Sequence, residues 1–205
     1  MNRQKRKRRK GSRERLLARR RMEIIIIIGC ALLALVGGYG WSRTAGEVGT
    51  ASVNEDVLAY EPLIEKYAKE YGVSSYVAVI EAMMQQESSG QGTDVMQCSE
   101  CYYNTEYAQS PGSIADPEYS IKTGIHYFAD CLELARCTGP RDTGRLKLAL
   151  QGYNYGHNYI NWAIERDGGY TEENAKAFSD MMKENLGWEV YGDPSYPQHV
   201  LRYYN

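Results

Sequence analysis

The chain has 205 residues, of which 43% are hydrophobic and 24% charged, a composition typical of a folded globular protein with room for one medium-sized domain and not two. Its net charge of -2 hides an uneven distribution. Residues 1–21 carry twelve Lys and Arg against one acid, Glu14, so the rest of the chain holds twelve bases against 25 acids. A block of like charge is typical of a solvated tail. The acidic remainder argues against a nucleic-acid partner, which the basic tail alone would fit.

A segment without charge follows the tail over residues 24–41, and its first part is almost wholly apolar. Its eighteen residues approach the lower limit of about 17–25 needed to cross a bilayer. Tyr39 and Trp41 lie where interfacial aromatic residues are expected, and the basic tail places the N-terminus in the cytoplasm. We therefore predict a cytoplasmic tail over residues 1–22, a transmembrane helix over 23–41, a linker over 42–55 and an extracellular domain over 56–205.

Two other interpretations of this segment stay open. A cleaved signal peptide also has a basic part followed by an apolar part, but here the basic part is long and no clear cleavage site follows residue 41. A buried helix of a soluble protein would need a polar face, and five consecutive isoleucines leave none. An uncleaved single-pass anchor in the cell membrane is the prediction that we carry forward.

From residue 56 onward the pattern is helical. Apolar residues recur at helical spacing up to Tyr71, and Gly72 is placed to end this first helix. Ser74 is placed to cap a second helix, whose apolar face reaches Met83 and Met84 before a loop rich in Gly, Ser and Gln begins at residue 88.

The rest of the domain continues as helices. Asp116 followed by Pro117 is the pattern of an N-cap with proline at the first helical position, and it predicts a helix that runs to about Arg136. Further helices are expected over residues 145–156, 159–165 and 171–186. No run of residues alternates with a period of two, so we predict an all-α domain with at most a minor β element.

Glu87 lies at the end of the second helix. It follows Met84, Met83 and Ile80 by three, four and seven residues, so its side chain projects from the apolar face. Partial desolvation there would raise the pKa of the carboxyl. A carboxylic acid that stays protonated near neutral pH is what protonation of a leaving glycosidic oxygen requires. Position alone fits equally a glutamate that turns to water or pairs with a base.

Three segments carry a resemblance to a known family. They are Gln86-Glu87-Ser88-Ser89-Gly90, Asp94-Val95-Met96-Gln97, and the run Ala-Leu-Gln-Gly-Tyr-Asn-Tyr-Gly over residues 149–156. In this order the chain resembles the lysozyme-like family of goose-type lysozymes and soluble lytic transglycosylases, and within it the CwlT-type muramidase domains of Gram-positive conjugative elements. The likeness spans about residues 57–204, including the closing stretch from Gly187 to Pro194.

The resemblance implies a lysozyme-like glycosidase that needs no cofactor or metal. Glu87 would be the general acid that cleaves the β-1,4 bond between N-acetylmuramic acid and N-acetylglucosamine in peptidoglycan. Ser88, Gln97, Tyr153 and Asn154 would contact the substrate, with the Tyr153 hydroxyl bonded to the carboxyl of Glu87. Either Tyr102 or Tyr103 would stack on a sugar. Local opening of the wall by a conjugation or secretion machine is the purpose that the resemblance suggests, and such proteins often continue into a peptidase domain.

The second carboxylate of ordinary glycosidases is not obvious. Asp94 is the best candidate, able to hold a water or to stabilise positive charge at the anomeric carbon, although a turn aspartate that accepts backbone amides fits it as well. A lytic transglycosylase needs only one carboxyl, because the muramic 6-hydroxyl attacks in place of water. A non-catalytic, glycan-binding scaffold is the alternative from another class.

The cysteines outside the predicted anchor form an even set: Cys98, Cys101, Cys131 and Cys137. In an oxidising compartment they favour disulfides, with three possible pairings that sequence cannot separate. Free thiols or a metal site are the alternatives, and the spacing of the second pair is wrong for a usual zinc site. The histidines show no spacing typical of a metal site or a catalytic triad.

Overall fold

The structure is a computed structural model that describes residues 49–205. The predicted tail and transmembrane helix lie outside the described residues, as do Cys30 and most of the predicted linker. Between residues 49 and 205 no helix is long and apolar enough to cross a membrane. The described residues belong to one compact unit, Glu47–Asn205.

Within this part of the chain the regular structure is helical, which confirms the predicted class. The helices are α2 (Glu55–Leu58), α3 (Glu61–Glu70), the 3-10 helix η1 (Ser74–Tyr76), α4 (Val77–Glu87), α5 (Pro117–Leu134), α6 (Thr143–Tyr155), α7 (His157–Asp167), α8 (Glu172–Leu186) and α9 (Tyr196–Leu201). The β-structure among the described residues is a single antiparallel bridge between Ala51 and Tyr204, near the two ends of the unit.

Two predictions about the first helices were wrong in detail. The first helix is divided, because α2 is capped by Asn54, and Pro62, which lacks a donor N–H, starts a new helix at α3. Ser74 does not cap α4; it opens η1, and α4 begins at Val77 without a side-chain cap. Gly72 does follow α3 with a φ of 74°, a left-handed conformation that glycine adopts without strain.

The helices α5 and α6 each begin directly after a residue whose side chain caps them. Asp116 accepts a hydrogen bond from the backbone N–H of Glu118, with Pro117 at the first position of α5, as predicted. Asp142, which was not predicted as a cap, caps α6 by accepting from the N–H of Arg145, so this helix begins at Thr143 and not at residue 145. The last helix, α9, was not predicted at all.

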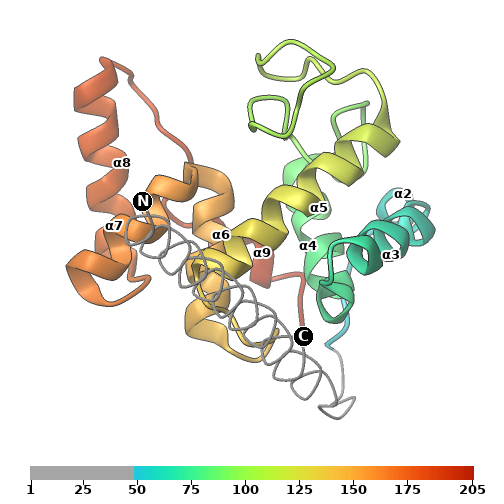
Figure 1. Cartoon of the computed structure of the whole chain (residues 1–205), viewed down its shortest axis with the longest axis horizontal. Helices are drawn as coiled ribbons and strands as arrows, with labels where there is room; N and C mark the ends of the chain where they lie inside the picture. The colour runs from blue at the N-terminus through green and yellow to red at the C-terminus, as the bar shows by residue number, and fades with distance from the viewer. Residues whose placement is uncertain (1–48) are drawn as a thin grey trace, which may run out of the picture. The chain divides into compact units, whose positions relative to one another are not determined.

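The helix α5 lies across the middle of the domain, packed against α3 and α6, while α6 also packs on α7 and α9 (Figure 1). The short α9 in turn packs against α4. As a result, the short helix near the C-terminus lies beside the helix that ends at Glu87, and it also packs against α6.

The loop after α4 packs closely against α5 at a glycine. A Cβ on Gly124 would lie 2.6 Å from the Cβ of Met96 and 3.0 Å from the hydroxyl oxygen of Tyr153. Only a residue without a side chain lets the loop approach the helix this closely. The loop that carries Met96 and Gln97 is therefore seated on α5 and not free.

Candidate functional site

Glu87 ends α4 beside fully buried side chains of the same face, including Met83 and Met84. Its own side chain is partly buried, and its Oε1 accepts a hydrogen bond of 2.5 Å from the hydroxyl of Tyr196. The same-face prediction is confirmed by this burial. The carboxyl has not turned fully to water, and no base of residues 49–205 forms an ion pair with it.

The surroundings of Glu87 favour its neutral form. Burial raises the pKa of the Glu87 carboxyl from the ordinary 4.5 to about 7, and the negative charges of Asp94 and Asp193 act in the same direction. The hydrogen bond from Tyr196 opposes them, because it stabilises the charged form. A substantial fraction of this carboxyl is therefore protonated at neutral pH, which is the state that a general acid needs.

Tyr153 lies in the core next to this site but is not bonded to Glu87, so the predicted contact was wrong. Its hydroxyl donates instead to the carbonyl oxygen of Met96, at 2.8 Å. Tyr153 thereby supports the loop that carries Met96. The hydrogen bond to Glu87 that was expected from Tyr153 comes from Tyr196 instead. The proline at the start of α9, Pro197, was the available signal for the helix that carries Tyr196.

Asp94 is buried in a closed set of donors. Its carboxylate accepts from the hydroxyls of Ser99 (2.5 Å) and Ser120 (2.7 Å), and from the backbone N–H groups of Cys98 (3.1 Å) and Ser99 (3.2 Å). With four bonds and 4% exposure, this side chain ties the loop to α5. It matches the turn aspartate that was the alternative to a catalytic role.

Ser88 and Gln97 are also bonded to the loop. The Ser88 hydroxyl donates to the carbonyl of Val95 (2.7 Å) and accepts from the N–H of Gly90 (3.1 Å). The Gln97 side chain donates to the carbonyl of Asp94 (2.8 Å), and its backbone holds a left-handed φ of 47°. Ser88 thus shapes the turn after α4, whereas Gln97 also faces a pocket.

That pocket has a volume of about 450 Å³ and brings together three of the predicted substrate-contacting residues, Gln97, Tyr153 and Asn154. Glu87, Ser88 and Asp94 are not in its wall. The remaining lining comes from the loop, α5, the end of α6 and the segment after α8: Cys98, Glu100, Cys101, Tyr127, Tyr155, Gly156, Trp188, Val190, Tyr191 and Gly192.

Asn154 connects the pocket to the C-terminal segment. Its side-chain oxygen accepts from the backbone N–H of Asp193 at 2.7 Å, and Gln151, one turn earlier on α6, donates to the carbonyl of Asp193 at 2.9 Å. The carboxylate of Asp193 contacts Nδ1 of His199 at 2.5 Å. No sequence pattern indicated this cluster, because Gln151 and Asn154 lie about 40 residues before Asp193 in the chain.

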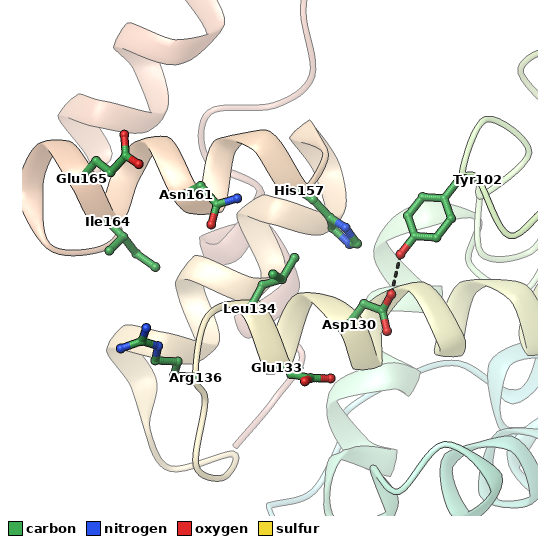
Figure 2. Close-up of a pocket in the computed structure, with 9 residues that line it drawn as sticks. All are labelled: Tyr102, Asp130, Glu133, Leu134, Arg136, His157, Asn161, Ile164 and Glu165. Atoms are coloured by element: carbon green, nitrogen blue, oxygen red, sulfur yellow. Dashed lines mark hydrogen bonds between the residues drawn. The ribbon is translucent and has the colours of Figure 1, made fainter. Parts of the chain in front are cut away.

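A second pocket, of about 610 Å³, lies beside the first and is shown in Figure 2. Tyr102 points into it and donates a hydrogen bond to Asp130, which also accepts from Tyr103 at 2.6 Å. His157 separates the two pockets, since its ring stacks on Tyr127 of the first pocket at a centroid distance of 4.5 Å. Tyr102 is therefore placed away from the Gln97 wall, where a sugar-stacking residue was expected.

The four cysteines of residues 49–205 are free thiols, so the expected disulfides are not formed in this structure. Cys98 donates to the carbonyl of Ser120 at 3.3 Å, and Cys137 to that of Gly139 at 3.4 Å. The described residues contain no group of three or more His, Cys, Asp or Glu side chains arranged to hold a metal ion.

Comparison with known proteins places this geometry in a family. A model of the lysozyme-like family matches residues 54–205. The bifunctional muramidase/DL-endopeptidase CwlT of Bacillus subtilis is 38% identical over 77% of this chain and 44% of its own length. The uncharacterized membrane protein YocA of the same organism is 37% identical over 65% of this chain and 56% of its own length.

A solved structure agrees with these matches. A Staphylococcus aureus protein described as similar to a lipoprotein superimposes with a TM-score of 0.61 at 36% identity, over 74% of this chain and 53% of that one. The chain thus spans about half the length of the curated relatives that it matches first. On the family model, the sequence identities and the shared fold together, the chain belongs to the lysozyme-like family.

Proposed function

We propose that this protein is a peptidoglycan hydrolase that cleaves the β-1,4 bond between N-acetylmuramic acid and N-acetylglucosamine. The observation that carries the proposal is Glu87, a partly buried acid at the end of α4 whose pKa is raised to about 7. Its charge acts on Tyr153, which lines the pocket together with Gln97 and Asn154. The proton of Glu87 would pass to the leaving glycosidic oxygen. The family membership and the muramidase named among the relatives support the same substrate.

The other proposed site residues have different roles, according to the groups that they contact. Gln97 and Asn154 would orient sugar hydroxyl or acetamido groups, since both line the pocket. Ser88 and Tyr153 would hold the walls that the sugars meet. Asp94 would act as a positioning residue, because its charge raises the pKa of Glu87 while its four hydrogen bonds fix the loop that carries Gln97.

The products of peptidoglycan digestion distinguish the possible reactions. Purified peptidoglycan is incubated with the full chain or with its Glu87→Gln variant, and the soluble fragments are analysed by mass spectrometry. Reducing muramic ends that vanish with the variant support a muramidase. Anhydro-muramic ends assign a lytic transglycosylase, which needs no second carboxylate. Intact glycan in both samples rejects an enzyme and leaves a glycan-binding scaffold.

The location of the protein is a separate proposal. The basic tail and the predicted transmembrane helix over residues 23–41 would hold the protein in the cell membrane by a single pass, with the catalytic domain facing the wall and serving a conjugation or secretion machine. A relative named as a membrane protein supports the anchor. Protease added to intact protoplasts should remove the domain and spare the tail; a protected domain would reverse the topology.

A further inference from the structure

Large apolar side chains are exposed at one place near the pocket. Of the exposed large hydrophobic residues in the described part of the chain, three lie within five positions of one another: Leu186 (43%), Trp188 (56%) and Val190 (73%). An exposed tryptophan next to an exposed valine costs solvation free energy and typically marks a binding surface. Two of the three, Trp188 and Val190, line the pocket that holds Gln97 and Asn154.

The segment that presents Trp188 is held in place at several points. Gly187 ends α8 in a left-handed conformation, and the backbone carbonyl of Tyr191 accepts from the Ser179 hydroxyl at 2.8 Å. The Tyr191 hydroxyl donates to the carbonyl of Tyr155 at 2.9 Å. The exposure of Trp188 therefore belongs to an ordered segment between α8 and α9.

Gly192 holds the same segment close against α6. Its φ is 52°, and a Cβ there would lie 2.5 Å from the ring of Tyr155 and 2.6 Å from the side-chain oxygen of Asn154. The next residue, Asp193, is bonded through its N–H to that same oxygen. Trp188 is thus presented from a fixed backbone, and its stacking face would lose little conformational entropy on binding.

The chemistry of the pocket lining fits a sugar. The lining combines the side-chain amides of Gln97 and Asn154 with the indole of Trp188 and the methyl groups of Val190. A pyranose ring presents apolar C–H groups on its faces and hydroxyl or acetamido groups around its rim. An aromatic face and two amides in one pocket match that arrangement. A sugar could pair with the side-chain oxygen of Gln97 and the side-chain N–H groups of Asn154, which the bonds to Asp94 and Asp193 do not use.

We infer that Trp188 is a substrate-binding residue whose indole stacks on an N-acetylhexosamine ring of a β-1,4-linked glycan strand. The inference rests on the proposed function, since it takes the same glycan as ligand. It assigns the stacking role to the segment after α8, and not to Tyr102, which lies in the second pocket.

Glycan binding to a chain that cannot cleave it tests the stacking role of Trp188. The full chain with Glu87→Gln is titrated with a soluble oligosaccharide of alternating N-acetylglucosamine and N-acetylmuramic acid, and tryptophan emission and calorimetry are recorded. Adding Trp188→Ala should weaken binding by about tenfold, which corresponds to about 1.4 kcal/mol, and abolish the emission change, because the stacking contact on the indole is lost. Trp188→Phe should keep most of the affinity. Leu186→Ala is the matched control, exposed on the same segment but outside the pocket wall.

The outcomes separate the inference from the proposed function. In the active chain, Trp188→Ala should raise KM and leave kcat nearly unchanged, as expected for contacts made equally in the ground and transition states. Equal affinity of the Trp188→Ala and Leu186→Ala chains would overturn the stacking role alone. An oligosaccharide that does not bind the Glu87→Gln chain at all would overturn the proposed substrate and the stacking role together.

Discussion

The hydroxyl of Tyr196 donates a 2.5 Å hydrogen bond to the carboxylate of Glu87 across 109 positions of sequence. The bond joins the short C-terminal helix α9 to the end of α4. It also sets the balance at the acid, because burial favours the neutral carboxyl and the hydroxyl favours the ionised one. Glu87 is poised near neutral pH by this opposition.

A pH profile follows from that balance. If protonated Glu87 is the acid, kcat/KM for peptidoglycan should fall as the pH rises through about 7. Tyr196→Phe removes a bond to the ionised form, so the pKa of Glu87 should rise and this alkaline limb should move to higher pH. Tyr170→Phe, which removes a hydroxyl bonded to Gln198, should leave the limb in place. A limb that moves to lower pH in Tyr196→Phe would contradict the assignment.

Because its pKa is raised in the folded protein, Glu87 should lower the free energy of unfolding at high pH. A folded-state pKa of about 7 against an ordinary 4.5 means that stability is fully present below pH 4.5 and is lost as the pH rises through 7. Glutamine cannot ionise, so Glu87→Gln should match the parent at pH 4 and exceed its unfolding free energy by about 3 kcal/mol at pH 8. Urea denaturation at the two pH values measures the difference.

Glu118 provides the control for this comparison. It is an exposed glutamate whose pKa is lowered, chiefly by its hydrogen bond from Lys66, so the sign of its effect on stability is opposite. Glu118→Gln should therefore bring no gain at pH 8. A gain of similar size in both variants would point to a general effect of net charge and not to the burial of Glu87.

The features that sequence predicted correctly are those set by local chemistry. Helical spacing placed Glu87 on a buried face, and the cap at Asp116 depends on a side chain two residues from the amide that it binds. The Tyr-Asn pair of residues 153 and 154 was likewise placed at the pocket, from the family motif. Each of these follows from short-range geometry or from a pattern carried in one segment.

The features that sequence missed depend on contacts between distant segments. Tyr153 and Tyr196 both lie near Glu87, and only the packing of α9 on α4 decides which hydroxyl reaches the carboxyl. Nor does spacing within the loop show that Asp94 is enclosed, because one of its strongest donors, Ser120, comes from α5. A helix of six residues such as α9 is also too short for a clear periodic signal.

Asp94 can be tested against a role as catalytic base. Asp94→Asn offers one acceptor oxygen where the carboxylate accepts four bonds, and its amide N–H groups would face donors, so the variant should lose about 2–4 kcal/mol of stability. Loss of its charge should also lower the pKa of Glu87 and move the alkaline limb to lower pH. Thermal denaturation and the pH profile measure both effects. Full stability with no turnover at any pH would instead mark a base.

The close approach at Gly124 gives a last prediction, about the wall of the pocket. In Gly124→Ala the new methyl group would overlap the Cβ of Met96 and press on the Tyr153 hydroxyl, which is bonded to the Met96 carbonyl. Overpacking of this kind costs about 1–3 kcal/mol, and it should also raise KM, because Gln97 follows Met96 in the displaced loop. Gly144→Ala in the first turn of α6 has nothing within 4 Å and should be neutral or slightly stabilising. If both alanine variants keep the parent melting temperature and KM, the close approach at Gly124 does not hold the loop, and its hydrogen bonds to Ser88, Ser120 and Tyr153 must fix the pocket wall.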